Sequence, residues 1–198
     1  GRAQTASNGL AMSPSEVIDG RATADIVFVC GGVDVERAVT TELSVTLRQL
    51  AQRGIALGSL CTGGYALAKA GLLDKYKAVI HWENMSALRE QFPRVVFSEQ
   101  LFAIDRDRYT CSGGIAPLDL MLNIIKDQLG QSIASMISEQ FILDRIRNDQ
   151  DRQHVPLQAR VGLFHENLIE AAALMEANIE EPLSLDDIAA LVEIGRAS

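Results

Sequence analysis

Residues 55–64 read IALGSLCTGG, a short apolar run followed by a cysteine and three small residues. The run from Ile55 to Leu60 has the length and composition of a strand that is buried on both faces, as in parallel sheets. A helix is expected to start directly after it, at Thr62, and to continue to Leu73. Cys61 then occupies a strand-to-helix turn, which directs its side chain toward the crevice where open α/β sheets bind ligands.

Strands and helices alternate on both sides of this turn. Before it, we expect a strand over 25–30 and a helix over 36–53 that ends at Gly54. After it, we expect strands over 78–80 and 109–112 and edge strands over 95–97 and 101–105. Helices are expected over 83–91, 117–129 and 132–146. Strand, helix, strand, helix is the order of a parallel sheet covered on both faces. The pattern predicts an α/β domain of the parallel-sheet, three-layer α/β/α class over residues 1–146.

Two further segments are expected after this domain. Residues 147–164 begin with a polar stretch that ends at Pro156, which is typical of a linker. Residues 165–198 contain two short helical patterns, over 167–180 and 185–192. Ser184 is placed to cap the second helix, with Asp187 as the acidic partner of a capping box. Two short helices bury little surface, so this all-α segment is expected to be the beginning of a larger unit.

Composition and charge limit the classes of function. The chain has 198 residues, a net charge of −8 and a pI near 4.9, which argue against a grip on nucleic-acid phosphates by this piece alone. No secretory signal or membrane-spanning run is present, so we expect a cytoplasmic protein that does not contact a membrane. The three cysteines include no CxxC spacing, and the sequence has no P-loop, no GxGxxG and no metal-spaced cluster. Neither a metal nor a cofactor is expected.

The candidate site is built around Cys61. The amino end of the following helix favours thiolate over thiol, so this residue could be chemically active; the alternative is a buried structural cysteine. His81 follows the third strand as Cys61 follows the second, and should face the same crevice. There it could accept a proton, with the Trp82 ring stacking on a cation, or both could be ordinary core residues. Cys30 and Cys111, each at the end of an apolar strand, are expected to be structural.

Glycine pairs complete the candidate site. Gly31-Gly32 and Gly113-Gly114 could let the backbone approach a ligand and offer N–H donors, or could simply serve tight turns. The expected ligand-binding residues are Gly32, Cys61, Thr62, His81, Trp82, Glu83 and Gly113.

The motifs of the first domain resemble those of a known family. The segments DIVFVCGG at 25–32, SLCTG at 59–63, LAKAGLL at 67–73, IHWE at 80–83 and YTCSGG at 109–114 resemble the ThiJ/PfpI, or class I glutamine-amidotransferase-like, domain, which has a flavodoxin-like fold. More narrowly, they resemble the amidase-like sensor at the N-terminus of AraC-family regulators. LMEANIEEPLSLDDIAALV at 174–192 resembles the first two helices of an AraC-type helix-turn-helix domain, in the order known for that architecture.

The resemblance implies a cytoplasmic, homodimeric sensor that binds a small-molecule effector around Cys61 without turning it over. Relatives of this kind respond to amino acids or to quaternary amines such as betaine and carnitine, and Trp82 with Glu83 would suit such a cation. Promoter DNA would be a partner through the full-length C-terminal domain. No DNA-binding residue is expected in this piece, because residues 164–198 hold only one basic residue, Arg196, against eight acidic ones.

Several departures from the family pattern are visible. Hydrolytic members have a histidine directly after the cysteine, where this chain has Thr62. An early glutamate that supports the cysteine has no counterpart, and the recognition helix expected after Val192 is missing, so both ends are expected to be truncated. The main alternative is a cysteine-dependent amidase, hydratase or deglycase with Cys61 as nucleophile and His81 as base. A redox sensor that oxidises Cys61 first is a further alternative.

Overall fold

The computed structural model describes residues 3–6, 9–19, 21–153, 166–178 and 181–192, and the chain divides into two units, 1–153 and 154–198. The strands of the first unit are β1 (Gln4–Thr5), β2 (Ala11–Met12), β3 (Ile26–Cys30), β4 (Ala56–Leu60), β5 (Lys77–Ala78), β6 (Val96–Phe97), β7 (Phe102–Asp105) and β8 (Arg108–Cys111). Its helices are α1 (Val35–Ala38), α2 (Thr41–Gln52), α3 (Gly64–Lys69), α4 (Met85–Gln91), α5 (Ala116–Leu129) and α6 (Gln131–Gln140), with short 3-10 turns η1 (Cys61–Gly63) and η2 (Trp82–Asn84).

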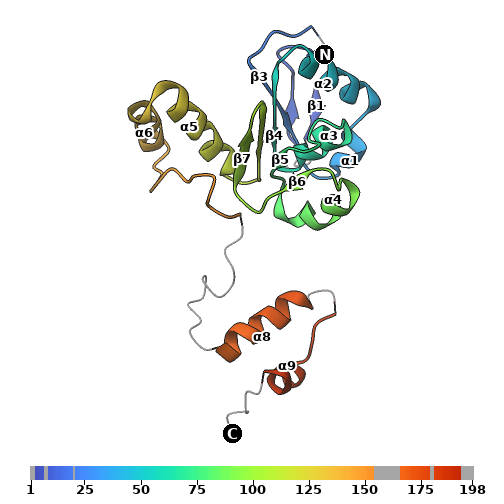
Figure 1. Cartoon of the computed structure of the whole chain (residues 1–198), viewed down its shortest axis with the longest axis vertical. Helices are drawn as coiled ribbons and strands as arrows, with labels where there is room; N and C mark the ends of the chain where they lie inside the picture. The colour runs from blue at the N-terminus through green and yellow to red at the C-terminus, as the bar shows by residue number, and fades with distance from the viewer. Residues whose placement is uncertain (1–2, 7–8, 20, 154–165, 179–180, 193–198) are drawn as a thin grey trace. The chain divides into compact units, whose positions relative to one another are not determined.

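The central sheet has the strand order β3-β4-β8-β7, with β3, β4 and β8 parallel and β7 antiparallel at the edge. β5 and β6 form a separate parallel pair, and β1 and β2 a small antiparallel one. Figure 1 shows α2 and α3 on the opposite side of this sheet from α5. The expected α/β class with a mostly parallel sheet between helical layers is therefore confirmed for the first unit.

Each face of the sheet has its own apolar core. On one face, Leu47 and Leu50 of α2 and Leu67 of α3 pack in a cluster with Leu57 of β4. On the other, Leu120 and Ile124 of α5 pack in a cluster with Phe102 and Cys111. Side chains alternate between the faces along each strand, so burial on both sides requires the continuous apolar runs seen in the sequence. These cores hold the carboxyl ends of β3, β4 and β8 in register, and the site lies at that edge.

Three helices differ from their predicted bounds. The helix expected over 62–73 is α3, which ends at Lys69. The single helix expected over 36–53 is broken at Val39, which is extended, and Thr40 caps a new helix by accepting a hydrogen bond from the Leu43 N–H at 3.1 Å. A threonine cap competes with helix continuation, and the apolar spacing alone did not reveal it. The helix expected over 132–146 ends at Gln140, because Phe141 leaves the helical geometry and Ile142 adopts a left-handed φ of 55°.

Residues 147–153, which we call the strap, form the end of the first unit and hydrogen bond to the rest of it. The Leu101 N–H donates to the Asp151 carbonyl at 2.8 Å, and the Gln153 N–H donates to the Glu99 carbonyl at 3.0 Å. Sequence analysis assigns the strap to a linker over 147–164, of which residues 154–164 lie outside the described part. Arg145 donates two hydrogen bonds to the Asp151 carboxylate and, as the main cause, lowers the pKa of Asp151 to about 2.

The second unit contains two described helices, α8 (Glu166–Ala177) and α9 (Leu185–Leu191). The Ser184 hydroxyl accepts a hydrogen bond from the Asp187 N–H at 3.2 Å, which confirms the predicted cap. The Ser184 hydroxyl donates to the Asp187 carboxylate at 2.5 Å, so Asp187 bonds to the Ser184 side chain and not to its backbone N–H, and the predicted capping box is wrong in this respect. Asn167 joins the two helices by donating to the Val192 carbonyl at 2.8 Å. The described part of this unit is helical, as expected.

Candidate functional site

Cys61 lies in a sharp turn between β4 and the helical segment that starts with η1. Its φ is 57°, whereas the residues on both sides have negative φ, so the chain reverses direction at this residue. Its N–H donates to the Ser112 carbonyl at 3.3 Å, which ties the turn to the end of β8. The predicted strand-to-helix turn is confirmed, and it brings the partly buried Cys61 side chain to the carboxyl edge of the sheet.

Two glycines make this turn possible by letting backbones touch. A Cβ on Gly31 would lie 2.1 Å from the Gly63 nitrogen, and one on Gly63 would lie 2.1 Å from the Val29 carbonyl oxygen. Neither distance is compatible with a side chain. Thr62 adds a hydrogen bond from its hydroxyl to the Gly32 carbonyl at 2.8 Å. Gly31 therefore serves the packing of the β3 loop against the Cys61 turn.

A cavity of about 540 Å³ opens at this edge of the sheet. Its walls come from the loop after β3, from the Cys61 turn with Tyr65, and from the segment between Ile80 and Leu88. Ligand sites typically enclose about 300–1,000 Å³, so the volume suits a metabolite. The crevice expected above the strand ends is thus present, and Cys61 lines it.

Acidic side chains dominate the charge of this cavity. Asp34, Glu36 and Glu83 line it, and no lysine or arginine is found among the described residues of its wall. The three residues are exposed, and negative groups that gather around a concave site still produce a negative potential that attracts cations. Tyr65 also lines the wall, but it is only 4% exposed and Lys69 Nζ already lies 5.5 Å from the centre of its ring. The wall is therefore suited to a ligand with a positive group.

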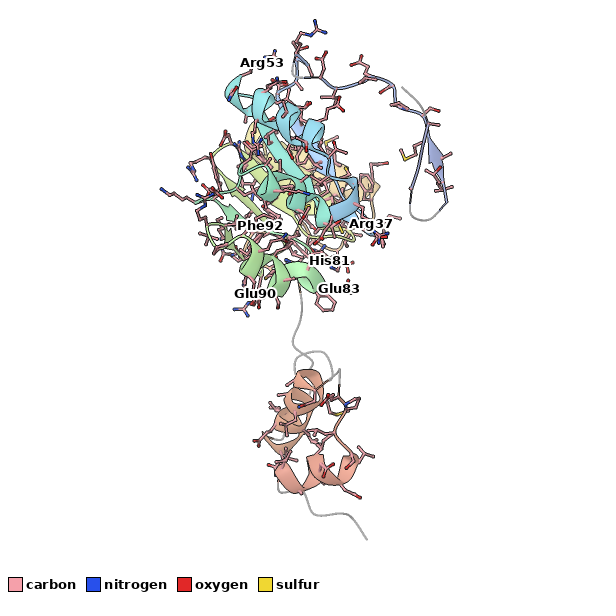
Figure 2. All side chains as sticks on the ribbon, turned by 90° about the vertical axis from the view of Figure 1, so that its right-hand side faces the viewer. Arg37, Arg53, His81, Glu83, Glu90 and Phe92 are labelled. Atoms are coloured by element: carbon pink, nitrogen blue, oxygen red, sulfur yellow. The ribbon has the colours of Figure 1, made fainter. Side chains whose placement is uncertain are left out.

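His81 lies between the acidic wall and the cysteine. Its Nδ1 is 3.6 Å from a carboxylate oxygen of Glu83, and Figure 2 shows the two side chains next to each other. The opposite edge of the ring faces Gly113: a Cβ on Gly113 would lie 2.8 Å from His81 Cδ2 and 3.0 Å from Cys61 Sγ. The sulfur and the imidazole therefore flank the same point, and only a glycine fits between them.

Cysteine and histidine are not hydrogen bonded to each other. Among the described residues no hydrogen bond links Cys61 Sγ to a His81 ring nitrogen. Base activation of a thiol needs such a contact, directly or through one water molecule. The site as it stands can hold a polar or cationic molecule against His81 and Glu83, with the sulfur at the same wall.

The other two cysteines differ from each other. Cys111 is fully buried, and this burial raises the pKa of its thiol to about 12, so the expected structural role is confirmed. Cys30 is exposed, and the expectation that it is buried is wrong. The reason is its place at the end of β3, an outer strand of the central sheet whose burial decreases toward its carboxyl end.

The structure brings most of the predicted site residues together. Five of the seven line the cavity: Gly32, Cys61, Thr62, His81 and Glu83. Gly113 lies next to the Cys61 sulfur and the His81 ring. Trp82 is about half exposed and is not part of the wall; its ring centroid lies 5.8 Å from that of His81.

Several residues of the cavity wall are not among those expected from the sequence. Asp34, Glu36 and Tyr65 were not predicted, although the first two follow a buried strand and its glycine turn directly. Charged residues at the carboxyl end of a parallel strand were the signal that could have identified them.

The described residues contain no group of three or more His, Cys, Asp or Glu side chains placed to hold a metal ion. Within the same part of the chain, no helix has the length and apolar character needed to cross a membrane.

The chain is similar to several known proteins. The HTH-type transcriptional regulator GbdR of Pseudomonas aeruginosa is 48% identical to this chain, over 99% of this chain and 53% of its own length. The HTH-type transcriptional regulator ArgR of the same organism is 45% identical, over 80% of this chain and 48% of its own length. The chain thus spans about half the length of the curated relatives it matches. The crystal structure of an AraC family transcriptional regulator from Pseudomonas putida has a TM-score of 0.65 at 30% identity, covering 71% of this chain and 76% of that one. The DJ-1/PfpI family model matches residues 1–127, and the chain is therefore a member of the DJ-1/PfpI family.

Proposed function

We propose that this chain is the ligand-sensing part of an AraC-type transcription regulator and that its effector is a small cationic metabolite. The observation that carries the proposal is the acidic cavity at the carboxyl edge of the sheet, with Asp34, Glu36 and Glu83 on its wall. The alignment with two regulators over most of this chain supports the same function. Within the expected class of amino acids and quaternary amines, the three carboxylates favour ligands with an ammonium or guanidinium group.

The second unit would be the beginning of the DNA-reading domain. The capped helix α9 and its contact with α8 are suited to the first helices of a helix-turn-helix. Promoter DNA would be bound by the remainder of the full-length regulator, and the regulator would act in the cytoplasm as a homodimer.

A thermal-shift experiment tests the class of effector. Choline, betaine and arginine are added to the chain, together with the uncharged carbon isostere of choline, in which a quaternary carbon replaces the nitrogen. We expect at least one cationic probe to raise the melting temperature and the isostere to have no effect, because the carboxylates stabilise only the charged molecule. Equal stabilisation by choline and its isostere would contradict a charge-selective cavity.

Glu83→Gln should reduce the affinity for the cationic probe by about tenfold, since it removes one facing charge near the ligand. Glu90→Gln is the matched control, because Glu90 is exposed on α4 and is not part of the cavity wall (Figure 2). Loss of affinity in both variants would place the effect outside the cavity.

A cysteine-dependent enzyme is the alternative, favoured by the way Cys61 Sγ and the His81 ring flank Gly113. NMR of each probe after prolonged incubation distinguishes the two functions. A sensor returns the probe unchanged, whereas turnover that Cys61→Ser abolishes would establish an enzyme.

A further inference from the structure

The strap touches the wall of the cavity from behind. The Gln153 side-chain Nε2 donates a hydrogen bond of 2.9 Å to the carbonyl of Ile80. Ile80 is fully buried and lines the cavity, and the next residue is His81. Gln153 is also the last residue of the first unit, since the second unit begins at residue 154. One side chain thus joins the cavity wall to the point where the chain leaves the sensor.

The segment that carries His81 is held by few hydrogen bonds. Val79 donates its N–H to the Thr110 hydroxyl at 2.8 Å, and the His81 carbonyl accepts from the Asn84 N–H at 3.0 Å. Between them, the Gln153 amide is the partner that the structure gives to the Ile80 carbonyl. A buried carbonyl needs such a partner, so the position of this wall depends on where Gln153 lies.

The Gln153 amide is only half satisfied in this arrangement. Its Oε1 is buried and has no hydrogen-bond partner within the described part of the chain. A buried amide oxygen without a partner is unfavourable, so this side chain stabilises the observed arrangement less than a fully paired amide would. A ligand shifts a population most readily where the free-energy difference between two arrangements is small.

The strap is fixed firmly at its other end. Arg147 donates its backbone N–H to Asp119 Oδ1 and its guanidinium to Asp119 Oδ2, and the Asp119 side chain is almost fully buried. Between the two ends, residues 151–153 pair with residues 99–101 through two backbone hydrogen bonds, which form an antiparallel β-bridge between Gln100 and Arg152. The strap is thus anchored at Arg147, and its other end, at Gln153, continues into the second unit.

We propose that Gln153 is a positioning residue that couples the cavity to the C-terminal unit. A ligand that contacts the Ile80–His81 wall changes the strength of the bond between the Ile80 carbonyl and the Gln153 amide, and so changes how tightly residues 151–153 hold to residues 99–101. Because coupling is reciprocal, a change at Gln153 alters the cavity wall as well. The inference rests on the proposed function for the identity of the ligand, but its second direction can be tested without any ligand.

The first arm uses Trp82, the one tryptophan of the chain, as a reporter beside His81. Gln153→Glu is nearly isosteric but replaces the donating amide with a carboxylate, which cannot donate to the Ile80 carbonyl when ionised. We expect it to change Trp82 emission and its quenching by acrylamide. Gln150→Glu makes the same chemical change at an exposed position of the strap and should leave both unchanged. Gln153→Met, which removes the donor without adding charge, should act as Gln153→Glu does.

The second arm measures amide hydrogen exchange of Leu101 and Gln153, whose N–H groups pair the strap with residues 99–101, with and without saturating choline. In the unsubstituted chain we expect choline to change their exchange by about fivefold, the effect of one hydrogen bond. In Gln153→Glu the exchange should no longer respond, while choline still binds.

The outcomes separate the two proposals. If Gln153→Glu and Gln153→Met alter Trp82 emission but the unsubstituted chain does not bind choline, the coupling is retained and the choline-like effector is rejected. Choline binding with unchanged exchange at Leu101 and Gln153 would overturn the coupling and retain the sensor. Equal effects of Gln150→Glu and Gln153→Glu on Trp82 would also overturn it.

Discussion

Burial gives the three cysteines different reactivities. Cys111 is inaccessible, and its pKa of about 12 leaves almost no thiolate at neutral pH, whereas Cys30 is exposed and Cys61 borders the cavity. We expect iodoacetamide at pH 7.5 to modify Cys30 and Cys61 in the folded chain and to reach Cys111 only after unfolding in urea. Peptide mass spectrometry of the labelled chain measures this. Labelling of Cys111 at the rate of Cys30 without denaturant would contradict the buried position.

Helix α5 and the strap are joined by a buried ion pair between Asp119 and Arg147, whose side chains are 3% and 28% exposed. Asp119→Ala leaves the guanidinium without its partner, so we expect the free energy of unfolding to fall by about 3 kcal/mol. Asp74→Ala breaks the pair with Arg94, whose side chain is 75% exposed, and should cost less than about 1 kcal/mol. Urea denaturation of both variants measures the difference. Similar losses in the two would mean that Arg147 finds other partners.

The elements also show how far local sequence determines this structure. Apolar runs and glycine stops identified β3, β4, β8 and α5 to within one or two residues, because burial on both faces leaves a continuous pattern. The polar sequence of the strap predicts a linker. Its side chains instead hydrogen bond to residues that are distant in the sequence, such as Asp119, and a local sequence pattern does not reveal such partners. The parallel topology predicts Cys61 and His81 at one edge of the sheet, whereas Trp82, at the start of η2, is half exposed and does not line the cavity.

At the scale of the whole molecule, apolar side chains on and after α6 remain uncovered in the single chain. Ile133 and Met136 of α6 and the following Phe141 are exposed, and apolar surfaces of this kind commonly pack against another subunit. We expect the chain to sediment as a dimer and Met136→Glu to shift it to the monomer in analytical ultracentrifugation. Ser135→Glu, at a less exposed polar position of the same helix, is the control. A dimer that persists in Met136→Glu would place the interface on another surface.

The left-handed conformation of Cys61 has a consequence for the energetics of the molecule. A residue with a Cβ loses about 1–2 kcal/mol at such a φ, whereas glycine adopts it freely. Stability alone would therefore favour glycine at position 61. The chain tolerates backbone strain there, and what it gains in return is a sulfur atom held at a fixed place on the wall of a cavity.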